Sequence, residues 1–241
     1  MRLADGFAPA YNVPTAVDVE HALIVVQKVT DHGADNRLLL PMAEAAKQAV
    51  GNPESLNVIA DAGYSNGEQA ERCESEGILP HVPANRGVNN QGNGQLFDRR
   101  EFSYDEETDT FRCPAQQRLT RKQLSRKDRA VYYASNPEVC GACTLKARCT
   151  NGKQRFVSRH LHEDALQRMQ QRATPEMMRL RRSTVEHPFA SLKYRIFGTG
   201  RFLLRGLNGA QSEISLAAMV YNLKRMINVL GGSSLMAAMT S

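Results

Sequence analysis

The chain has 241 residues, of which 41% are hydrophobic, and it carries a formal net charge of +6. This length allows one sizeable core or two small ones, and the hydrophobic fraction is that of a globular protein. The positive charge favours a polyanionic partner such as nucleic acid, although many basic proteins bind none. No signal peptide and no run of about 18 apolar residues is visible, so we expect a cytoplasmic protein without a membrane span.

Two short β-rich runs open the chain. Residues 15–17 and 22–26 predict strands, and the polar residues between them suit a hairpin turn. Residues 36–50 then predict an amphipathic helix with one apolar side. Because Pro41 lies in its early part, this helix is expected either to start near Leu40 or to be kinked.

A second strand and helix follow. The apolar run over residues 56–60 predicts a short buried strand that ends at Asp61. Ser65 or Asn66 can cap the next helix. Residues 78–83 predict another short strand. The N-terminal part of the chain therefore predicts an α/β fold.

Composition divides the chain into four parts. Residues 1–96 carry the strands and helices just described, whereas residues 97–159 are polar, rich in cysteine and expected to form an insertion. Helical periodicity returns over residues 160–230, with Pro188 among the positions expected to kink or interrupt it. Residues 231–241 are mostly Gly, Ser, Ala and Met, and predict a flexible tail.

One motif in the helical part joins an acid to two cations. Arg182, Glu186 and Lys193 follow the spacing R-x3-E-x6-K, and steps of four and seven residues return to the same face of a helix. An acid that holds a metal beside a phosphodiester would need both cations, because they can bind the phosphates. The alternative is a surface glutamate in ion pairs worth roughly 0.2–0.5 kcal/mol each.

Asp61 is a second candidate acid, or else a turn-forming residue, since Asp is common after a strand. Cleavage of a phosphodiester by two metals needs carboxylates from separate elements, which hold the ions roughly 3.5–4 Å apart. Mg²⁺ suits such a site because it keeps several waters and takes one or two carboxylates. Together, Asp61 and Glu186 indicate a DNA-processing enzyme that uses Mg²⁺ or Mn²⁺.

The cysteines of the insertion form a second candidate metal site. Cys113, Cys140, Cys143 and Cys149 give the spacing C-x26-C-x2-C-x5-C, in which the C-x2-C pair fits one tetrahedral ion. Four thiolates suit a structural Zn²⁺. Free thiols in a small core, or a disulfide, remain as alternatives. The fifth cysteine, Cys73, lies on a predicted helix and is expected to be a buried thiol.

Basic and aromatic residues gather near these cysteines. They are Arg118, Arg121, Lys122, Arg126, Lys127, Lys146, Arg148, Lys153, Arg155, Tyr132 and Tyr133. Such a combination suits phosphate contact and base stacking. A solvated charged face is an equally good interpretation.

The chain resembles the C-terminal part of a DDE transposase of bacterial insertion sequences, in the subgroup with a Cys-rich insertion and an R-x3-E-x6-K motif. The likeness lies in residues 10–18, 29–30, 35–36, 61–64, 140–143 and 185–189. It implies a ribonuclease-H-like mixed sheet flanked by helices. The implied partners are DNA, as transposon terminal repeats and target, and a second copy in a homodimer associated with the nucleoid.

The resemblance also assigns roles to single residues. The family's second and third catalytic acids match Asp61 and Glu186, which would hold two Mg²⁺ ions. In relatives the cations at the positions of Arg182 and Lys193 contact phosphates, so that role carries over. Arg179 stands where the family has a tyrosine; it adds a cation and loses the contacts of a phenol.

The family's first acid has no counterpart here. In relatives it lies on a strand ahead of the hairpin, and nothing before Tyr11 predicts such a strand; Asp18 lies in the hairpin turn. We therefore expect a truncated catalytic domain that lacks its first strand and does not cut DNA alone. The alternatives are a non-catalytic DNA- or zinc-binding remnant of a transposase, and a self-associating fragment without function.

Overall fold

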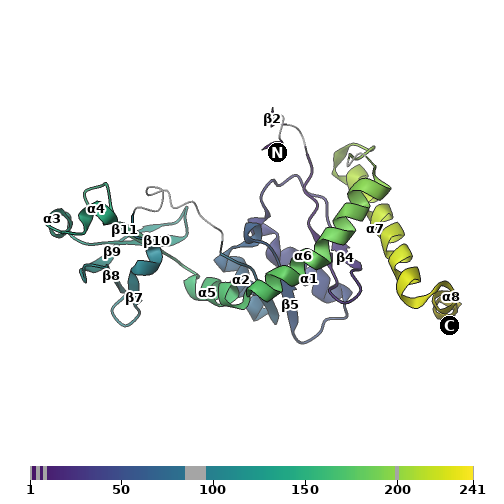
Figure 1. The fold of residues 1–241 in the computed structure, drawn as a ribbon, viewed down its shortest axis with the longest axis horizontal. Helices are drawn as coiled ribbons and strands as arrows, with labels where there is room; N and C mark the ends of the chain where they lie inside the picture. Colours follow the sequence, from purple (N-terminus) through teal and green to yellow (C-terminus); the bar gives the residue numbers. More distant parts are fainter. Residues whose placement is uncertain (1, 4–5, 8–9, 85–95, 199–200, 241) are drawn as a thin grey trace. The chain divides into compact units, whose positions relative to one another are not determined.

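The computed structural model describes residues 2–3, 6–7, 10–84, 96–198 and 201–240. The chain divides into two compact units (Figure 1). Unit 1 combines Met1–Ala84 with Ala165–Ser241, and unit 2 is Asn85–Asp164. The cysteine-rich stretch 97–159 lies within unit 2.

Unit 1 takes its strands from the N-terminal segment and most of its helices from the C-terminal segment. The N-terminal elements are β1 (Arg2–Leu3), β2 (Gly6–Phe7), β3 (Thr15–Val17), β4 (Ile24–Gln27), η1 (Asp35–Arg37), α1 (Leu39–Ala49), β5 (Leu56–Ile59), η2 (Ala62–Tyr64), α2 (Gly67–Ser75) and β6 (Ile78–His81). The C-terminal elements are α5 (Glu163–Arg172), α6 (Pro175–Ala190), η4 (Ser191–Ile196), α7 (Gly206–Leu230) and α8 (Gly232–Thr240).

Local sequence signals explain where these elements begin. α1 starts at Leu39, so that Pro41 falls in its first turn, where its missing N–H is not needed. The side chain of Asn66 caps α2 by accepting a hydrogen bond from Gln69 N at 3.3 Å. The predicted hairpin is also confirmed, because β3 and β4 pair antiparallel.

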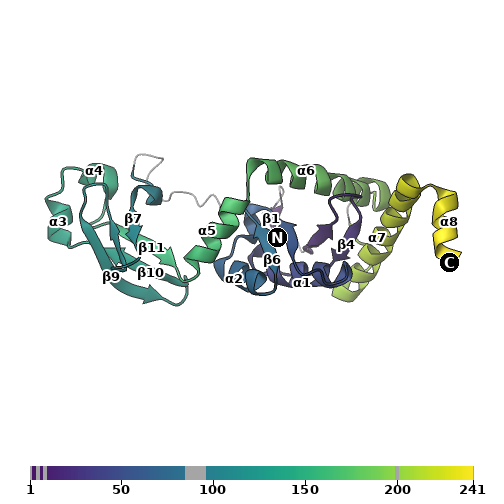
Figure 2. The same ribbon diagram turned by 90° about the horizontal axis from the view of Figure 1, so that it is seen from below.

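The strands of unit 1 form separate pairs. β3 pairs with β4, while β5 and β6 form a parallel pair. In the described part of the chain no strand joins these two pairs into one mixed sheet. Figure 2 shows β3 to β6 lying between α6 on one side and α1 and α2 on the other.

Two hydrophobic clusters hold unit 1 together. One lies around α1, α2, β6 and α5; its buried residues are Leu39, Leu40, Ala43, Ala60, Ala70, Cys73, Ile78, Val82, Ala165 and Met169. The other joins the hairpin to α7; its buried residues are Ile24, Val29, Leu192, Ala210, Ile214, Ala217, Ala218 and Tyr221. Cys73 is fully buried, as expected, and burial raises the pKa of its thiol to about 12.

Unit 2 contains an antiparallel sheet whose strand order follows the chain order. Its elements are η3 (Arg99–Glu101), β7 (Ser103–Asp105), β8 (Thr110–Arg112), β9 (Arg118–Ser125), β10 (Ala130–Ala134), α3 (Pro137–Gly141), α4 (Lys146–Cys149) and β11 (Phe156–His160). Its core is Phe97, Phe102, Phe111, Leu119, Val131, Tyr133 and Val157. The apolar content of the insertion is therefore sufficient for a core of its own, which its polar composition did not predict.

The C-terminal segment differs from expectation at two places. Pro188 does not interrupt α6 but lies inside it, and the irregularity follows as the π-helical turn η4. The tail after Gly231, expected to be flexible, is helical as α8. Ala, Leu and Met favour helix, and Leu235 is buried, so packing adds to propensity. No helix in the described residues has the length and apolar character needed to cross a membrane.

Candidate functional site

A cleft of about 630 Å³ lies in unit 1 between the two strand pairs. β3 and β5 form its sides, and α1 and α6 contribute apolar walls. The polar side chains of Asp35, Asp61, Tyr64 and Arg181 lie together at one end. The lining includes Asn12, Thr15, Ala16, Val17, Asp35, Leu39, Met42, Ala43, Ala46, Leu56, Asn57, Val58, Ile59, Ala60, Asp61, Tyr64, Arg181, Thr184, Val185 and Phe189. Among the candidate acids of the sequence, Asp61 lies in this cleft.

Asp61 follows the last residue of β5 and caps η2. Its Oδ1 accepts a hydrogen bond from Gly63 N at 2.9 Å. Its Oδ2 accepts one from Arg181 Nη2 at 2.8 Å, which makes an ion pair with a carboxylate that remains 46% exposed. The cation paired with Asp61 is thus Arg181, whereas the sequence motif predicts a role in the site for its neighbour Arg182.

Asp35 is a second carboxylate at the same end of the cleft. A methyl group added at Gly63 would lie 3.0 Å from Asp61 Oδ1 and 3.6 Å from Asp35 Oδ2, so both carboxylates approach one point. Asn12 Nδ2 donates a hydrogen bond to Asp35 Oδ1. Asp35 was not expected as a site residue, because an acid before a helix is an ordinary helix-start signal.

The pKa of Tyr64 reflects the burial and the charges at this end of the cleft. Burial, and then the negative charges of Asp35 and Asp61, raise the pKa of its phenol to about 12, while Arg181 acts in the opposite direction. A phenol with this pKa stays protonated at neutral pH and can donate a hydrogen bond. The group therefore combines two acceptors, one cation and one donor.

The residues of the R-x3-E-x6-K motif are exposed. Arg182, Glu186 and Arg179 are exposed on α6, and Glu186 is not among the described residues that line the cleft. On α6 the cleft is reached by Arg181, Thr184, Val185 and Phe189 instead. The structure therefore brings Asp61 together with Asp35 and Arg181, while the pairing of Asp61 with Glu186 stays a prediction.

Lys193 lies beyond the end of α6. It is exposed on η4, with its Nζ 5.3 Å from the centre of the Tyr194 ring. Because the π-helical turn changes the angular step per residue, Lys193 does not keep the register of a continuous α-helix with Glu186. Glu186 and Lys193 are thus seven residues apart in the sequence, but they do not share one face of a regular α-helix.

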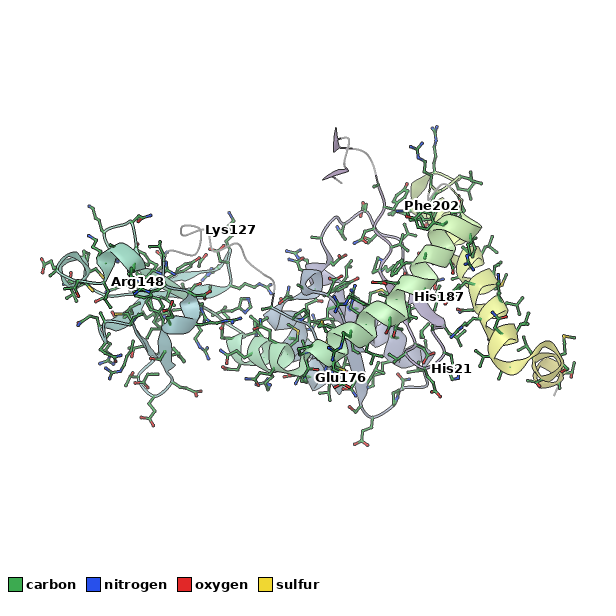
Figure 3. All side chains as sticks on the ribbon, in the orientation of Figure 1. His21, Lys127, Arg148, Glu176, His187 and Phe202 are labelled. Atoms are coloured by element: carbon green, nitrogen blue, oxygen red, sulfur yellow. The ribbon has the colours of Figure 1, made fainter. Side chains whose placement is uncertain are left out.

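His187, labelled in Figure 3, connects α6 to α7. Its Nδ1 lies 3.0 Å from the hydroxyl of Tyr221 on α7, and that hydroxyl donates to Ala22 O at 2.8 Å. The hydroxyl therefore accepts from the imidazole. The residue next to Glu186 therefore has a packing role.

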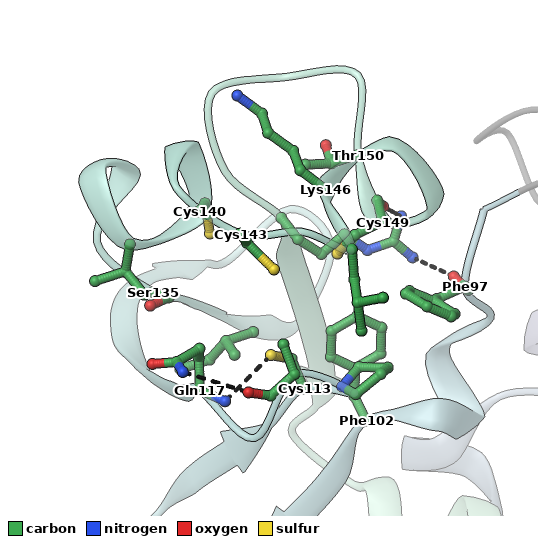
Figure 4. A pocket seen from close by; sticks show the side chains of 16 residues that line it. Phe97, Phe102, Cys113, Gln117, Ser135, Cys140, Cys143, Lys146, Cys149 and Thr150 are labelled. Carbon is green, nitrogen blue, oxygen red and sulfur yellow. Dashed lines mark hydrogen bonds between the residues drawn. The ribbon is translucent and has the colours of Figure 1, made fainter.

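The four cysteines of unit 2 line a common pocket (Figure 4). Cys113 comes from the turn after β8, Cys140 and Cys143 from α3 and its end, and Cys149 from α4. Burial raises the pKa of the Cys149 thiol; Arg155 opposes this shift, and the other three thiols add to it. Across the described ranges, no three His, Cys, Asp or Glu side chains are arranged as the ligands of one metal ion.

Several basic residues of unit 2 are used within the unit. The guanidinium of Arg148 lies 4.9 Å from the centre of the Phe97 ring, and that of Arg155 lies 5.5 Å from the centre of Phe102. These two were candidates for DNA contact. Their stacking on core aromatics favours a structural role, whereas Arg121 and Lys122 on β9 remain exposed.

Comparison with known proteins identifies the family. A family model described as transposase DDE domain matches residues 5–223. Searches of curated proteins and of solved structures each gave no significant match. Transposases act on DNA, and those with a DDE domain use divalent metals such as Mg²⁺. Because the matched segment covers most of the 241 residues, the chain belongs to the family of transposase DDE domains.

Proposed function

We propose that this chain acts in DNA transposition by cleaving phosphodiester bonds and transferring DNA strands, with Asp61 and Glu186 as metal-binding carboxylates. One observation carries the proposal. The carboxylate of Asp61 follows β5, is half exposed in the cleft, and lies beside both Asp35 and Arg181. A carboxylate next to a second acid and a cation is the environment in which a metal and a phosphate can be held together.

The donors fit the metal that the family uses. Carboxylate oxygens are the ligands that Mg²⁺ prefers, and Mg²⁺ needs only one or two of them because it keeps several waters. Such ions would activate a water or a DNA 3′-hydroxyl and stabilise the leaving oxygen. Arg181 already pairs with Asp61 Oδ2, so a metal ion at Asp61 would share the carboxylate with this cation or displace it.

The exposed cations of α6 and η4 are proposed to bind DNA. Arg182, Arg179 and Lys193 present their charges to solvent, where they can contact phosphates without reading sequence. Binding through them would weaken steeply with salt, because each phosphate contact releases counterions. We also propose that two copies act together on paired transposon ends.

The site in this form is proposed to be catalytically incomplete. Asp61 is neutralised by Arg181, and Glu186 lies outside the lining of the cleft. A further carboxylate near Asp61 would favour opening of the ion pair and binding of the ions. The same observation supports the second candidate function, a non-catalytic remnant that binds DNA and zinc.

Metal-dependent nicking of supercoiled DNA tests the catalytic proposal. The chain is compared with a version extended upstream in its reading frame, each with Mg²⁺ and with Mn²⁺. We expect the extended version to nick, and Asp61→Asn or Glu186→Gln to reduce nicking at least about 100-fold, which corresponds to about 2.7 kcal/mol. Glu176→Gln, an exposed acid on the same helix, is the matched control. Nicking that survives both active-site changes would overturn the assignment.

For unit 2 we propose a structural Zn²⁺ held by Cys113, Cys140, Cys143 and Cys149. The support is that all four line one pocket from three separate segments, and four thiolates are a common ligand set for Zn²⁺. We expect about one zinc per chain in purified protein by elemental analysis, lost in Cys143→Ser and retained in Cys73→Ser. Equal zinc content in the two variants would contradict the proposal.

A further inference from the structure

The segment that leads into α7 exposes one leucine almost completely. The side chain of Leu203 is 90% exposed, the largest fraction among the large apolar side chains of the described residues, and that of its neighbour Leu204 is 54% exposed. Single exposed leucines are common on protein surfaces and need no explanation by themselves. This leucine differs because the backbone around it is held in place from two sides.

A carboxylate of α7 holds the backbone at this position. Glu213 Oε2 accepts a hydrogen bond from Leu203 N at 2.9 Å, and Glu213 Oε1 accepts one from Leu204 N. Hydrogen bonds to an ionised acceptor are roughly twice as strong as those between neutral groups. The two oxygens of one side chain thus fix two successive amides, so the backbone that carries Leu203 is tied to α7.

Packing holds the residues on either side of Leu203. The ring of Phe202, labelled in Figure 3, lies 5.4 Å from that of Phe197, centre to centre, and both pack against the hydrophobic cluster of α7 and the hairpin. A Cβ atom added at Gly209 would lie 2.8 Å from Leu204 Cβ, so the segment approaches α7 as closely as a glycine allows. Leu203, between these two contacts, is left in solvent.

The surroundings of the exposed leucine are positively charged. Between residues 187 and 212 the chain has four Lys and Arg residues and no Asp or Glu. The four are Lys193, Arg195, Arg201 and Arg205, and all are exposed. Cations on both sides of an apolar tip favour a polyanion with an apolar interior. Duplex DNA has this character, because its stacked bases lie between two phosphate backbones.

The apolar tip is too small for a protein partner of its own. A stable protein interface buries roughly 800 Å² on each partner, far more than the side chains of Leu203 and Leu204 offer. A wedge between two bases needs only one apolar side chain. Leucine is among the residues that insert between base steps, and arginine and lysine accompany it in the minor groove.

We propose that Leu203 inserts as a wedge between neighbouring base pairs of duplex DNA, from the minor groove, while Arg201 and Arg205 contact the phosphates on either side. Glu213 is a positioning residue, because a loosely held leucine would be pushed aside instead of separating the bases. Insertion should occur most readily at TA and CA/TG steps, which unstack easily. The inference rests on the proposed function only in that the chain must bind DNA, and not on the catalytic assignment.

Base unstacking by the whole chain tests this proposal. The DNA is a duplex of repeated TA steps that carries 2-aminopurine, whose fluorescence rises when it loses its stacked neighbours. The chain is added to saturation without divalent metal, so no bond is cut. We expect a rise with the native chain and the loss of most of it with Leu203→Ala. Equal signals from the two would overturn the proposal.

Leu216→Ala is the matched control for this change. It removes a leucine that is 61% exposed on α7, outside the segment held by Glu213, and it should leave the fluorescence rise unchanged. Because both leucines are exposed, circular dichroism should be the same for both variants. A signal lost equally in Leu216→Ala would contradict insertion by Leu203.

A duplex with one abasic site provides a second test, because it already contains a gap in the stack. The native chain should bind it at least about fivefold more tightly than the intact duplex, since less unstacking has to be offset. Leu203→Ala should lose this preference, whereas Leu216→Ala should keep it. A preference that survives in Leu203→Ala would overturn the wedge.

Further variants separate phosphate contact from insertion. Arg201→Ala and Arg205→Ala should each weaken binding to both duplexes alike and reduce the salt slope by about one. Glu213→Ala should lower the fluorescence rise although Leu203 is present, and Glu213→Gln, which keeps one acceptor oxygen, should restore part of it. A full rise at saturation with Glu213→Ala would contradict the positioning role.

Two other outcomes distinguish this inference from its alternatives. If Leu203 and the exposed apolar side of α7 formed one protein-docking surface, Leu203→Ala and Leu216→Ala would both change the oligomeric state in light scattering and neither would change the fluorescence; that result would overturn the wedge. DNA binding without unstacking would also overturn it and leave the proposed function intact. Unstacking without nicking by any version of the chain would support the wedge and count against the catalytic proposal.

Discussion

The strands of the two units pair in different ways. In unit 2 each strand pairs with the next one along the chain, from β7 to β11, so short turns bring partners together. In unit 1 the hydrogen bonds that close the outer edge of β4 come from residues 182 and 198 positions away. The described strands of unit 2 thus form one continuous sheet, whereas those of unit 1 form separate pairs.

The arginines of the two units also differ in the contacts that their side chains make. Arginines of unit 2 combine ion pairs with stacking on rings: Arg159 lies 4.4 Å from the centre of Tyr104 and pairs with Asp164 at 2.7 Å. Those of unit 1 pair with carboxylates, such as Arg181 with Asp61 and Arg172 with Glu74. At the polar end of the cleft the ion pair is not fully buried, since the side chains of Arg181 and Asp61 are 26% and 46% exposed. The following predictions test whether the units are as distinct as this contrast implies.

The largest effect is expected from Phe111→Ala in the core of unit 2. The Phe111 ring is 2% exposed and lies 5.0 Å from Tyr104 and 5.1 Å from Tyr133, centre to centre. Its removal should lower the free energy of unfolding by about 3–5 kcal/mol. Calorimetry should show this as a shift of one transition, with the transition of unit 1 unchanged.

Phe156→Ala is the control for that change, because the Phe156 side chain is largely exposed on β11. It should shift neither transition measurably. A single transition that moves as a whole with Phe111→Ala would show that the two units unfold together and would break the comparison.

In unit 1 the corresponding test is Glu74→Gln. Glu74 accepts from Arg168 at 2.6 Å and from Arg172, and its side chain is 17% exposed. Burial acts to raise the pKa of Glu74, but the hydrogen bonds from the two arginines outweigh it and leave the pKa lowered. The loss of this charge should cost about 1–3 kcal/mol of stability.

The pH dependence of Glu74 has a defined sign. A lowered folded-state pKa means that the contribution is complete above the unfolded-state pKa and is lost as pH falls through the folded-state pKa. The difference in stability between the native chain and Glu74→Gln, measured in urea, should therefore shrink under acid. A difference that is constant with pH, or that appears equally in Glu54→Gln, would contradict this account.

A smaller effect is expected from Asp109→Asn in unit 2. Asp109 accepts hydrogen bonds from the hydroxyls of Tyr104 and Tyr133, and the bond from Tyr133 is the main reason that its pKa is lowered. Its backbone has φ 47°, which asparagine tolerates. Loss of the charge should cost about 1–2 kcal/mol in chemical denaturation, whereas Glu107→Gln in the same turn should cost nothing measurable.

The smallest effect is expected at the start of α2. Asn66→Ala removes the side-chain acceptor for Gln69 N and should cost about 1 kcal/mol. Ser65→Ala, the other capping candidate of the sequence, should cost less. The reverse order, measured by thermal unfolding of unit 1, would show that Ser65 is the working cap.

Much of the local structure was determined by the sequence itself. The hairpin β3–β4, α1 with Pro41 in its first turn, β5 before Asp61 and the cap at Asn66 follow from strand periodicity, proline chemistry and hydrogen-bonding side chains. Each of these signals acts within a few residues. The motif order also sufficed to indicate the transposase family.

Tertiary structure decided the composition of the candidate site. The sequence paired Asp61 with Glu186 and two flanking cations, but packing of α6 directs Arg181 into the cleft and leaves Glu186 exposed outside its lining. One residue along a helix is about 100° of rotation, and no local signal fixes that angle. Asp35 was missed for a related reason, because only the fold brings it beside Asp61.

The open cleft has the same physical origin. Residue pattern predicts that a segment is a strand, but which edges meet depends on chain segments far apart, whose entropy cost of closure only the whole fold can offset. The sequence by itself therefore determined the elements and the family. Only the tertiary structure decided which side chains share the cleft and which of the described strands pair with one another.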